Sequence, residues 1–150
     1  MTDYLKKIDD GLIIEEPKIV LPWKLEKKDF FDIINDIKVI NENYYTFKIK
    51  LSGISFINCA GLHFEKERLS KIDLFNDEKY FSESEIIHIF HAHQLILENL
   101  FGNPNRNYLL DKYKGVNKEY KWKFRYITII HKLWDRFGIE EDLKIFVNIK

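Results

Sequence analysis

Hydrophobic and polar residues alternate most regularly in two stretches of the chain. In residues 44–51, large hydrophobic side chains fall at every second position and lysines lie between them. In residues 120–126, aromatic residues alternate with basic ones: Tyr120, Trp122, Phe124 and Tyr126 with Lys121, Lys123 and Arg125. A period of two is typical of a strand with one buried face. We therefore predict a strand in each stretch, the second extending to residue 130 or beyond.

Shorter apolar segments predict further strands. Residues 12–14 and 19–21 are apolar runs with a polar segment between them, and each is predicted to be an edge strand. The other predicted strands, an antiparallel meander and the end of a final hairpin, are residues 54–60, 61–65, 69–75 and 143–149. Residues 103–119 contain several asparagines and are expected to form a long loop, while residues 135–142 connect to the last strand.

A short helix is predicted in the N-terminal part of the chain. After Asp29, which we expect to be the N-cap, hydrophobic residues recur with the spacing i, i+3, i+4 and i+7: Phe30, Ile33, Ile34 and Ile37. This spacing places the apolar side chains on one face of a helix. The segment should therefore pack that face on the sheet.

A second, longer helix has clearer boundaries. Ser82 is followed three residues later by Glu85, the pattern of a capping box in which each side chain binds a free backbone N–H of the other residue. Gly102 suits the position after the last turn, and Pro104 prevents the helix from continuing. The sequence predicts one helix over about residues 83–101.

Together these elements predict an α+β fold. We expect an antiparallel sheet of about five to six strands, with the short N-terminal helix and the long helix of about 83–101 packed on one face. The 150 residues fit a single domain, 1–150, with residues 1–10 frayed. Its predicted core includes Phe47, Ile49, Phe90, Leu97, Trp122 and Phe124.

Composition excludes several classes of protein. The chain is 45% hydrophobic and 15% aromatic, which is enough apolar material for a core and unlike a disordered chain. Its 24 basic residues balance 24 acidic ones, giving a net charge of zero, whereas proteins that bind nucleic acids normally carry a basic excess. We therefore expect no nucleic-acid partner, and we interpret residues 120–126 as a core strand.

The expected location is cytoplasmic. The single cysteine, Cys59, excludes an intrachain disulfide, fits a reducing compartment and is expected to be a buried, unreactive side chain. The N-terminus has no apolar segment of the kind found in a signal peptide. The chain also has no apolar run of about 18 residues, so we expect no membrane partner.

Three histidines, His88, His91 and His93, fall within six residues and raise the question of a metal site. On a helix, His88 and His91 share a face, but His93 points elsewhere. The spacing Glu85-x-x-His88 resembles half of a di-iron carboxylate site, but the second copy that such a site needs is missing. We interpret the three as histidines at the boundary of a half-buried helix, and we expect no metal and no cofactor.

The sequence contains none of the common catalytic motifs. It has no G-x-S-x-G, no glycine-rich phosphate loop, no H-E-x-x-H and no pair of cysteines. His63 and His131 are isolated in the sequence. We therefore expect no catalytic residues and a protein that is not an enzyme. Two alternatives are a small homodimeric scaffold or interaction module, and a small enzyme whose active-site residues are dispersed along the chain.

The order of several short motifs resembles a known group of proteins. These motifs are Leu21-Pro22-Trp23, Leu69-x-x-Ile72-x-Leu74, the helix end from Leu97 to Pro104, a strand with a tryptophan, and Asp135-Arg136-Phe137-Gly138. In this pattern the chain is similar, over about residues 12–149, to the small α+β immunity proteins that bacteria encode beside polymorphic or contact-dependent toxins. The resemblance implies a monomer or homodimer that neutralises a cognate toxin domain by stoichiometric binding in the cytoplasm.

The distribution of charge predicts where such a partner would bind. Residues 51–110 contain eight acidic and five basic residues. A nuclease toxin is commonly basic where it holds phosphate, so an inhibitor should offer it an acidic surface. We predict partner-binding residues in two segments, one entering the long helix and one on the last hairpin: Asp77, Glu78 and Glu83, and Glu140, Glu141 and Asp142.

Overall fold

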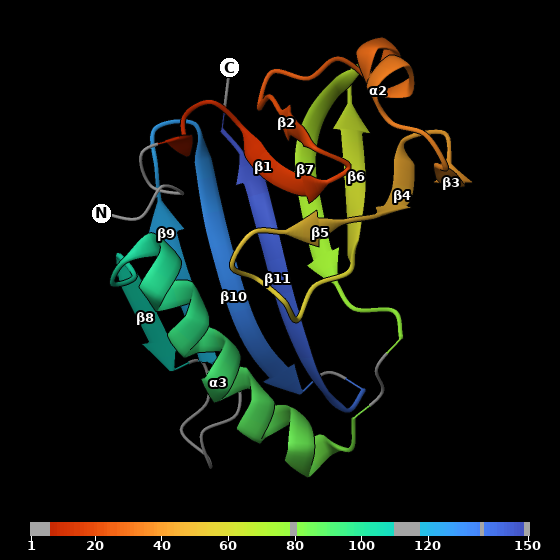
Figure 1. Cartoon of the computed structure of the whole chain (residues 1–150). Helices are drawn as coiled ribbons and strands as arrows, with labels where there is room; N and C mark the ends of the chain where they lie inside the picture. The colour runs from red at the N-terminus through yellow and green to blue at the C-terminus, as the bar shows by residue number, and fades with distance from the viewer. Residues whose placement is uncertain (1–6, 79–80, 110–117, 136, 149–150) are drawn as a thin grey trace.

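The computed structural model describes residues 7–78, 81–109, 118–135 and 137–148, and the fold is built on two antiparallel sheets (Figure 1). The large sheet has eight strands, in the spatial order β3 (Lys38–Asn41), β4 (Tyr44–Lys48), β6 (Cys59–Glu65), β7 (Arg68–Phe75), β11 (Ile139–Val147), β10 (Ile127–Asp135), β9 (Lys118–Lys123) and β8 (Arg106–Leu109). The small sheet has the order β2 (Ile19–Leu21), β1 (Leu12–Glu16) and β5 (Lys50–Leu51). Two helices are α2 (Lys27–Ile33) and α3 (Glu83–Phe101).

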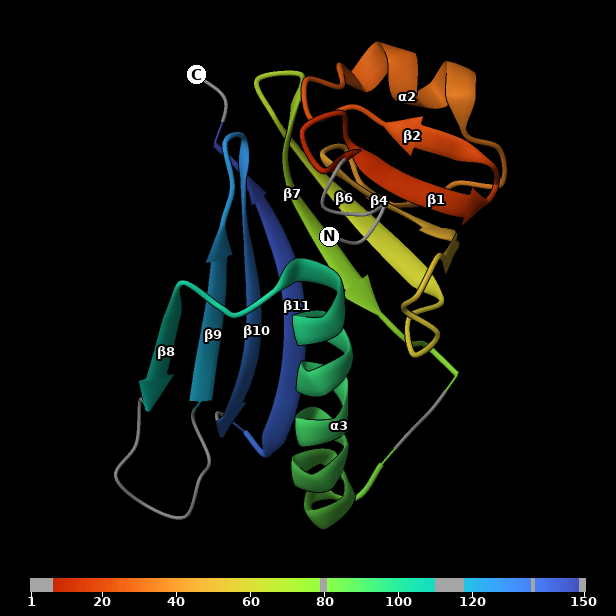
Figure 2. The same ribbon diagram turned by 60° about the vertical axis from the view of Figure 1, so that its left-hand side comes forward.

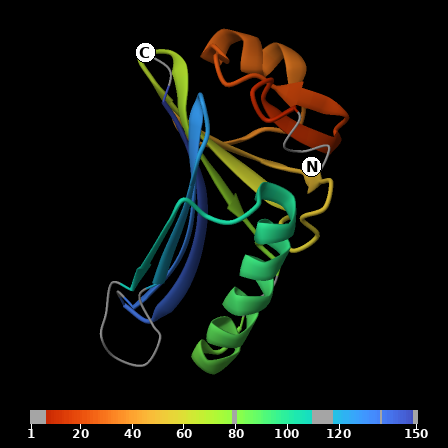
Figure 3. The same cartoon turned by 90° about the vertical axis from the view of Figure 1, so that its left-hand side faces the viewer.

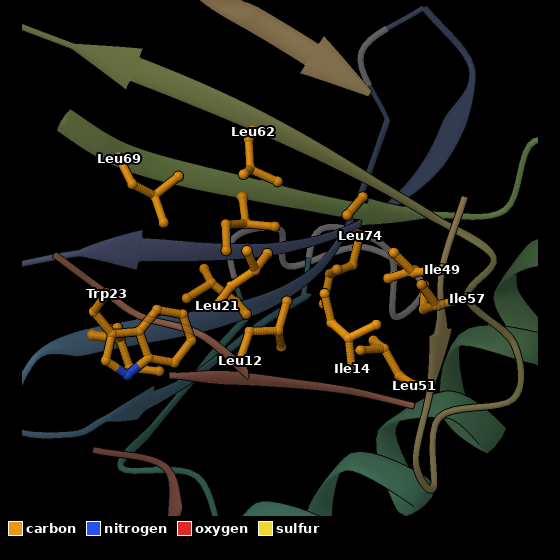
Figure 4. Packing of buried hydrophobic residues seen from close by; sticks show 14 of the residues in the cluster. Leu12, Ile14, Leu21, Trp23, Ile49, Leu51, Ile57, Leu62, Leu69 and Leu74 are labelled. Atoms are coloured by element: carbon orange, nitrogen blue, oxygen red, sulfur yellow. The ribbon is translucent and has the colours of Figure 1, made fainter. Parts of the chain in front are cut away.

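The small sheet and α3 cover the same face of the large sheet (Figure 3). The small sheet lies over β6 and β7, and α3 lies beside β10 and β11 (Figure 2). Between these layers is the main hydrophobic core, where side chains of β1 and β2 meet side chains of β6 and β7 (Figure 4). The α+β class and the antiparallel sheet predicted from the sequence are therefore confirmed.

The N-terminal segment joins this core. Trp23 is 3% exposed, and its Nε1 donates a hydrogen bond to the carbonyl oxygen of Ile8 at 2.6 Å. Ile8 is itself 7% exposed. The expectation that residues 1–10 are frayed is therefore wrong at Ile8, while residues 1–6 lie outside the described part of the chain.

The large sheet has more strands than the five to six predicted. One reason is that the chain reverses within the aromatic stretch: β9 ends at Lys123, the backbone N–H of Phe124 donates to the carbonyl oxygen of Ile127 at 2.9 Å, and β10 begins there. Trp122 is buried as predicted, but Phe124 lies in the turn and is only half-buried. A second reason is β8, which forms within the segment predicted to be a loop; residues 110–117 of that segment lie outside the described residues.

Three other strand boundaries differ from the prediction. The strand predicted over residues 44–51 is two strands, β4 and β5, which belong to different sheets. Residues 54–58 lie in a loop instead of the start of a strand, and within it the backbone N–H of Ile57 donates to the carbonyl oxygen of Ile54 at 3.4 Å. The expected antiparallel partner of β4 is nevertheless present as β6. Residues 140–142, expected in a connection, belong to β11, which pairs with β10 from Ile139 to Val147.

The short helix α2 starts earlier and ends earlier than expected. Its N-cap residue is Glu26, and Asp29 lies in the first turn, where a negative charge is favourable near the positive end of the helix dipole. The helix ends at Ile33, and Asp36 adopts a positive φ of 56°. Phe30 is fully buried as the pattern requires, but Ile33 is 42% exposed.

The long helix α3 has the predicted bounds. Ser82 is the N-cap residue and Gly102 the C-cap residue, with a positive φ of 83° that favours glycine. The expected capping box does not form, because the Ser82 hydroxyl donates to the Glu85 carboxylate at 2.7 Å and binds no backbone N–H. Phe90 and Leu97 are both fully buried on the face toward the sheet. Among the described residues, no helix is long and apolar enough to cross a membrane.

The substitution Ser82→Ala should therefore have little effect on stability. A serine that caps a backbone N–H contributes about 1 kcal/mol, but this hydroxyl makes exposed contacts with the side chains of Glu85 and Ser84 instead. We expect the free energy of unfolding to change by less than about 0.5 kcal/mol, measured by urea denaturation. A loss of about 1 kcal/mol or more would show that the hydroxyl caps the helix.

Candidate functional site

The main cavity described by the structure is a cleft between the first half of α3 and the turn that joins β10 to β11. Its volume is about 510 Å³. Both sides meet at the same end of the molecule, where α3 begins and β10 ends (Figure 2). The walls are mostly apolar and include Phe56, Phe81, Ile86, Ile89, Phe137 and Leu143. We call this feature the α3 cleft.

One face of α3 supplies both the wall of the cleft and its polar groups. Glu83, Ile86, Phe90 and His93 follow each other at intervals of three or four residues, so they form one stripe along the helix. Phe90 is buried against the sheet, which turns the whole stripe toward β10 and β11. Glu83 therefore faces the cleft from the first turn, and its Oε1 comes close to Gly138 in the opposite turn.

A carboxylate between two histidines forms the inner end of the α3 cleft. Both oxygens of Glu141 on β11 lie 2.9 Å from Nδ1 of His93 on α3. Oε2 of Glu141 also lies 2.5 Å from Nε2 of His131 on β10. The three side chains thus connect the helix to the last hairpin. His131 is fully buried, whereas the Glu141 and His93 side chains are 20% and 14% exposed.

Neighbouring side chains hold this cluster in place. Nδ1 of His131 lies 2.7 Å from the amide Oε1 of Gln94, which comes from α3 and is itself buried. The His131 ring stacks on Phe90 with centroids 4.1 Å apart, and the His93 ring stacks on Phe56 at 3.6 Å and an angle of 9°. Each imidazole is therefore fixed by one ring contact and by its bond to Glu141.

The histidines determine the charge of Glu141. Burial alone would raise the pKa of this carboxyl, but the hydrogen bonds from His131 and His93 outweigh burial and lower its pKa from 4.5 to about 2. Glu141 is therefore ionised at neutral pH. Burial also lowers the pKa of His131, an effect that its bond to Glu141 opposes in part.

The ionised carboxylate sets the tautomer of His93. A carboxylate without a proton can only accept, so Nδ1 of His93 must donate to Glu141. The other nitrogen, Nε2, makes no hydrogen bond within the part of the chain that the structure describes. His93 itself lines the cleft, with its side chain 14% exposed.

The fold places the three residues of the first predicted partner-binding segment in two different surroundings. Asp77 receives two hydrogen bonds of 2.6 Å from Lys48 and one of 2.9 Å from Asn58, and this lysine lowers the pKa of the carboxyl. Glu78 lies 3.6 Å from the same lysine. The charges of these two residues are thus offset by Lys48. Glu83 alone among the three faces the α3 cleft.

The second predicted segment is divided between two faces of the sheet. Glu141, like Leu143 after it, points toward α3, and alternation along β11 directs Glu140 and Asp142 to the opposite face. There they lie opposite Trp134 and Lys132 of β10. The three carboxylates therefore do not share one face of the strand, although all three residues border the cleft, and their role in binding a partner stays a prediction.

The histidine cluster of the sequence is also divided. His88 and His91 are exposed on the outer side of α3, and only His93 reaches the site. No group of three or more residues suited to a metal ion is found among the described residues. His131, which has no neighbour of its kind in the sequence, is the partner that sequence reasoning missed. The sequence feature that could have identified it is its place in the alternation of β10, because it occupies an inward-facing position between Ile129 and Leu133.

The arrangement at the inner end of the cleft is one that proteins use in more than one way. A histidine oriented through Nδ1 by a carboxylate also occurs in general bases, and the described lining residues include no serine, threonine, cysteine or lysine. Comparisons with family models, curated proteins and solved structures give no match.

Proposed function

We propose that this chain is an immunity protein that binds a cognate bacterial toxin domain in the cytoplasm and neutralises it by stoichiometric binding. The observation that carries the proposal is the α3 cleft, with its apolar walls and the carboxylates of Glu83 and Glu141 on opposite sides. An apolar cleft with a few convergent polar groups is the common form of a binding site. The order of motifs that resembles immunity proteins supports the class of partner.

Phe137 is an exposed aromatic residue of the kind found in protein interfaces. Its side chain is 95% exposed, the largest exposure among the large hydrophobic residues described. Exposing a whole aromatic ring to water is unfavourable, and aromatic residues of this kind act as anchors when a partner covers them. Phe137 lies in the turn between β10 and β11, at the border of the cleft. A partner that enters the cleft therefore also covers this ring.

Phe137→Ala and Glu83→Gln should each weaken binding of the toxin domain encoded beside the gene for this chain. Loss of a buried aromatic anchor costs about 2 kcal/mol or more, which raises Kd at least about 30-fold. Loss of the Glu83 charge should act mainly on the association rate and reduce its dependence on salt. Surface plasmon resonance at low and high salt measures both effects.

Two matched variants control for effects outside the cleft. Glu78→Gln removes an exposed carboxylate that does not line the cleft, and Leu95→Ala removes a hydrophobic side chain, 63% exposed, from α3. Both should bind the toxin domain as tightly as the wild type and protect cells equally well. Normal binding by both cleft variants would place the toxin elsewhere, and failure of the wild-type chain to bind or protect would rule out the immunity function.

A further inference from the structure

We propose that the α3 cleft receives an arginine side chain of the partner protein. This inference rests on the proposed function, because it names the chemical group through which the toxin domain would enter the cleft. The cleft has two properties that together specify such a group. Its lining supplies carboxylate acceptors, Glu83 from the first turn of α3 and Glu141 beside His93, and apolar surface around them.

The α3 cleft presents carboxylates as hydrogen-bond acceptors. Glu83 and Glu141 both line it, and an ionised carboxylate only accepts. His93 donates from Nδ1 to Glu141 at 2.9 Å and so holds this carboxylate in place. A ligand that matches these groups must donate several hydrogen bonds. Arginine has five N–H donors and no acceptor.

Another polar side chain at the α3 cleft, Asn76, is bound to its own chain. Its Nδ2 donates to the carbonyl oxygen of Phe56 at 3.3 Å, and its Oδ1 accepts from the backbone N–H of Glu78 at 2.9 Å. Asn76 is therefore fixed by the loop in which it lies. The acceptors that can bind a ligand are the carboxylates of Glu83 and Glu141.

Charge in the α3 cleft also favours a cation. Glu83 and Glu141 approach from the helix and from the sheet, and among the described lining residues there is no lysine or arginine. This differs from Asp77, whose charge is offset by Lys48 at 2.6 Å. A positive side chain entering the cleft would be attracted by both carboxylates, because electrostatic attraction in a partly enclosed site is stronger than in water.

The apolar walls suit the rest of an arginine side chain. Its three methylene groups can pack along Ile86, Ile89 and Leu143 while the charged end reaches the acceptors. A planar guanidinium also stacks on aromatic rings, and Phe137 is exposed at the same cleft. Lysine lacks this plane and is more strongly hydrated, so arginine is the better fit.

The test uses a small probe and the whole chain. Nα-acetyl-arginine N-methylamide is titrated into the ¹⁵N-labelled protein, and the amide signals of His93, Gly138 and Glu141 are followed by NMR. We expect saturable shifts at these residues with a Kd in the millimolar range, as for other small ligands. The citrulline analogue, which has the same shape but no charge, should give no saturable shift. The lysine analogue should bind more weakly than the arginine probe.

Variants locate the effect within the cleft. Glu83→Gln should raise the Kd of the arginine probe about tenfold, the loss expected for one charged hydrogen bond, whereas Glu78→Gln should leave it unchanged. The NMR spectrum of each variant shows directly whether it is folded. Equal affinity of Glu83→Gln and wild type, equal binding of arginine and citrulline probes, or tighter binding of the lysine probe would each overturn the inference.

The same probe separates this inference from the proposed function. If the toxin domain binds but the arginine probe causes no saturable shift in the wild-type protein, the arginine site is wrong and the immunity function stands. If the probe binds in the cleft but the toxin domain does not bind the chain, the immunity function is wrong. Competition between probe and toxin domain for the wild-type chain supports both, because it requires one shared site.

Discussion

Replacing Phe90 by alanine should lower the free energy of unfolding by about 3–5 kcal/mol. Phe90 is fully buried in the middle of α3, where its ring stacks on His131 at 4.1 Å and lies 6.0 Å from the ring of Tyr120. The substitution removes apolar surface and leaves a cavity that helix and sheet can close only in part, so both costs apply. Urea denaturation at constant pH measures the change.

Phe137→Ala is the matched control for this substitution. It removes the same atoms from a residue that is 95% exposed, so the free energy of unfolding should change by less than about 0.5 kcal/mol. The dependence on urea concentration should stay equal in both variants if neither changes the unfolded state. A Phe90→Ala protein within about 1 kcal/mol of the wild type would contradict the packing of this helix face on β10.

The sequence predicts elements well where local signals define both of their ends. For α3, Ser82 marks the start, Gly102 marks the end, and the spacing of Phe90 and Leu97 gives the buried face. All of these signals lie within about one turn of the residues that they affect. These local signals can be recognised in a single sequence, because they do not depend on contacts between distant segments.

The reversal between β9 and β10 could not be predicted in this way. The alternation of large and polar residues continues through Phe124 and Tyr126, which is the pattern of an unbroken strand. In the structure these residues form a tight turn that returns the chain antiparallel, with Trp122 opposite Ile129. Continued alternation would bury residue 128, whereas β10 buries Ile127 and Ile129, so the turn shifts the pattern by one residue. A turn without glycine or proline gave no local signal of this shift.

The site depends on contacts between distant residues, so the sequence predicted only some of its members. Glu83 and Glu141 were expected in separate patches, and the fold places them on two sides of one cleft. His93 meets Glu141 from 48 residues away, and His131 meets it from 10 residues away on the neighbouring strand. The useful feature of the sequence is the position of each polar residue in the alternation of its strand. Both His131 and Glu141 occupy inward-facing positions, and a buried polar residue needs a partner.

Glu141→Gln should lower the free energy of unfolding at neutral pH by about 3 kcal/mol, the value that corresponds to a carboxyl pKa of 4.5 in the unfolded chain and about 2 in the folded one. The neutral amide keeps the shape of the side chain but cannot carry the charge to which His93 and His131 donate. Denaturation by urea at neutral pH measures this loss.

The pH dependence of stability is a second test of the contact between Glu141 and the two histidines. Because the pKa of Glu141 is lower in the folded state, the unfolded chain binds more protons between about pH 4.5 and pH 2, and stability falls as the pH falls through that range. The wild type should therefore lose more stability than Glu141→Gln between about pH 5 and pH 3. Other carboxyls act equally in both proteins and cancel in the comparison.

Glu140→Gln controls for the loss of one negative charge from β11. Glu140 is exposed on the opposite face of the sheet, so its replacement should change stability at neutral pH by less than about 0.5 kcal/mol. A double-mutant cycle with His93→Gln then isolates the bond across the cleft, because the two losses should not add. Equal stability of Glu141→Gln and Glu140→Gln at neutral pH, with parallel acid profiles, would show that Glu141 does not hold α3 to the last hairpin.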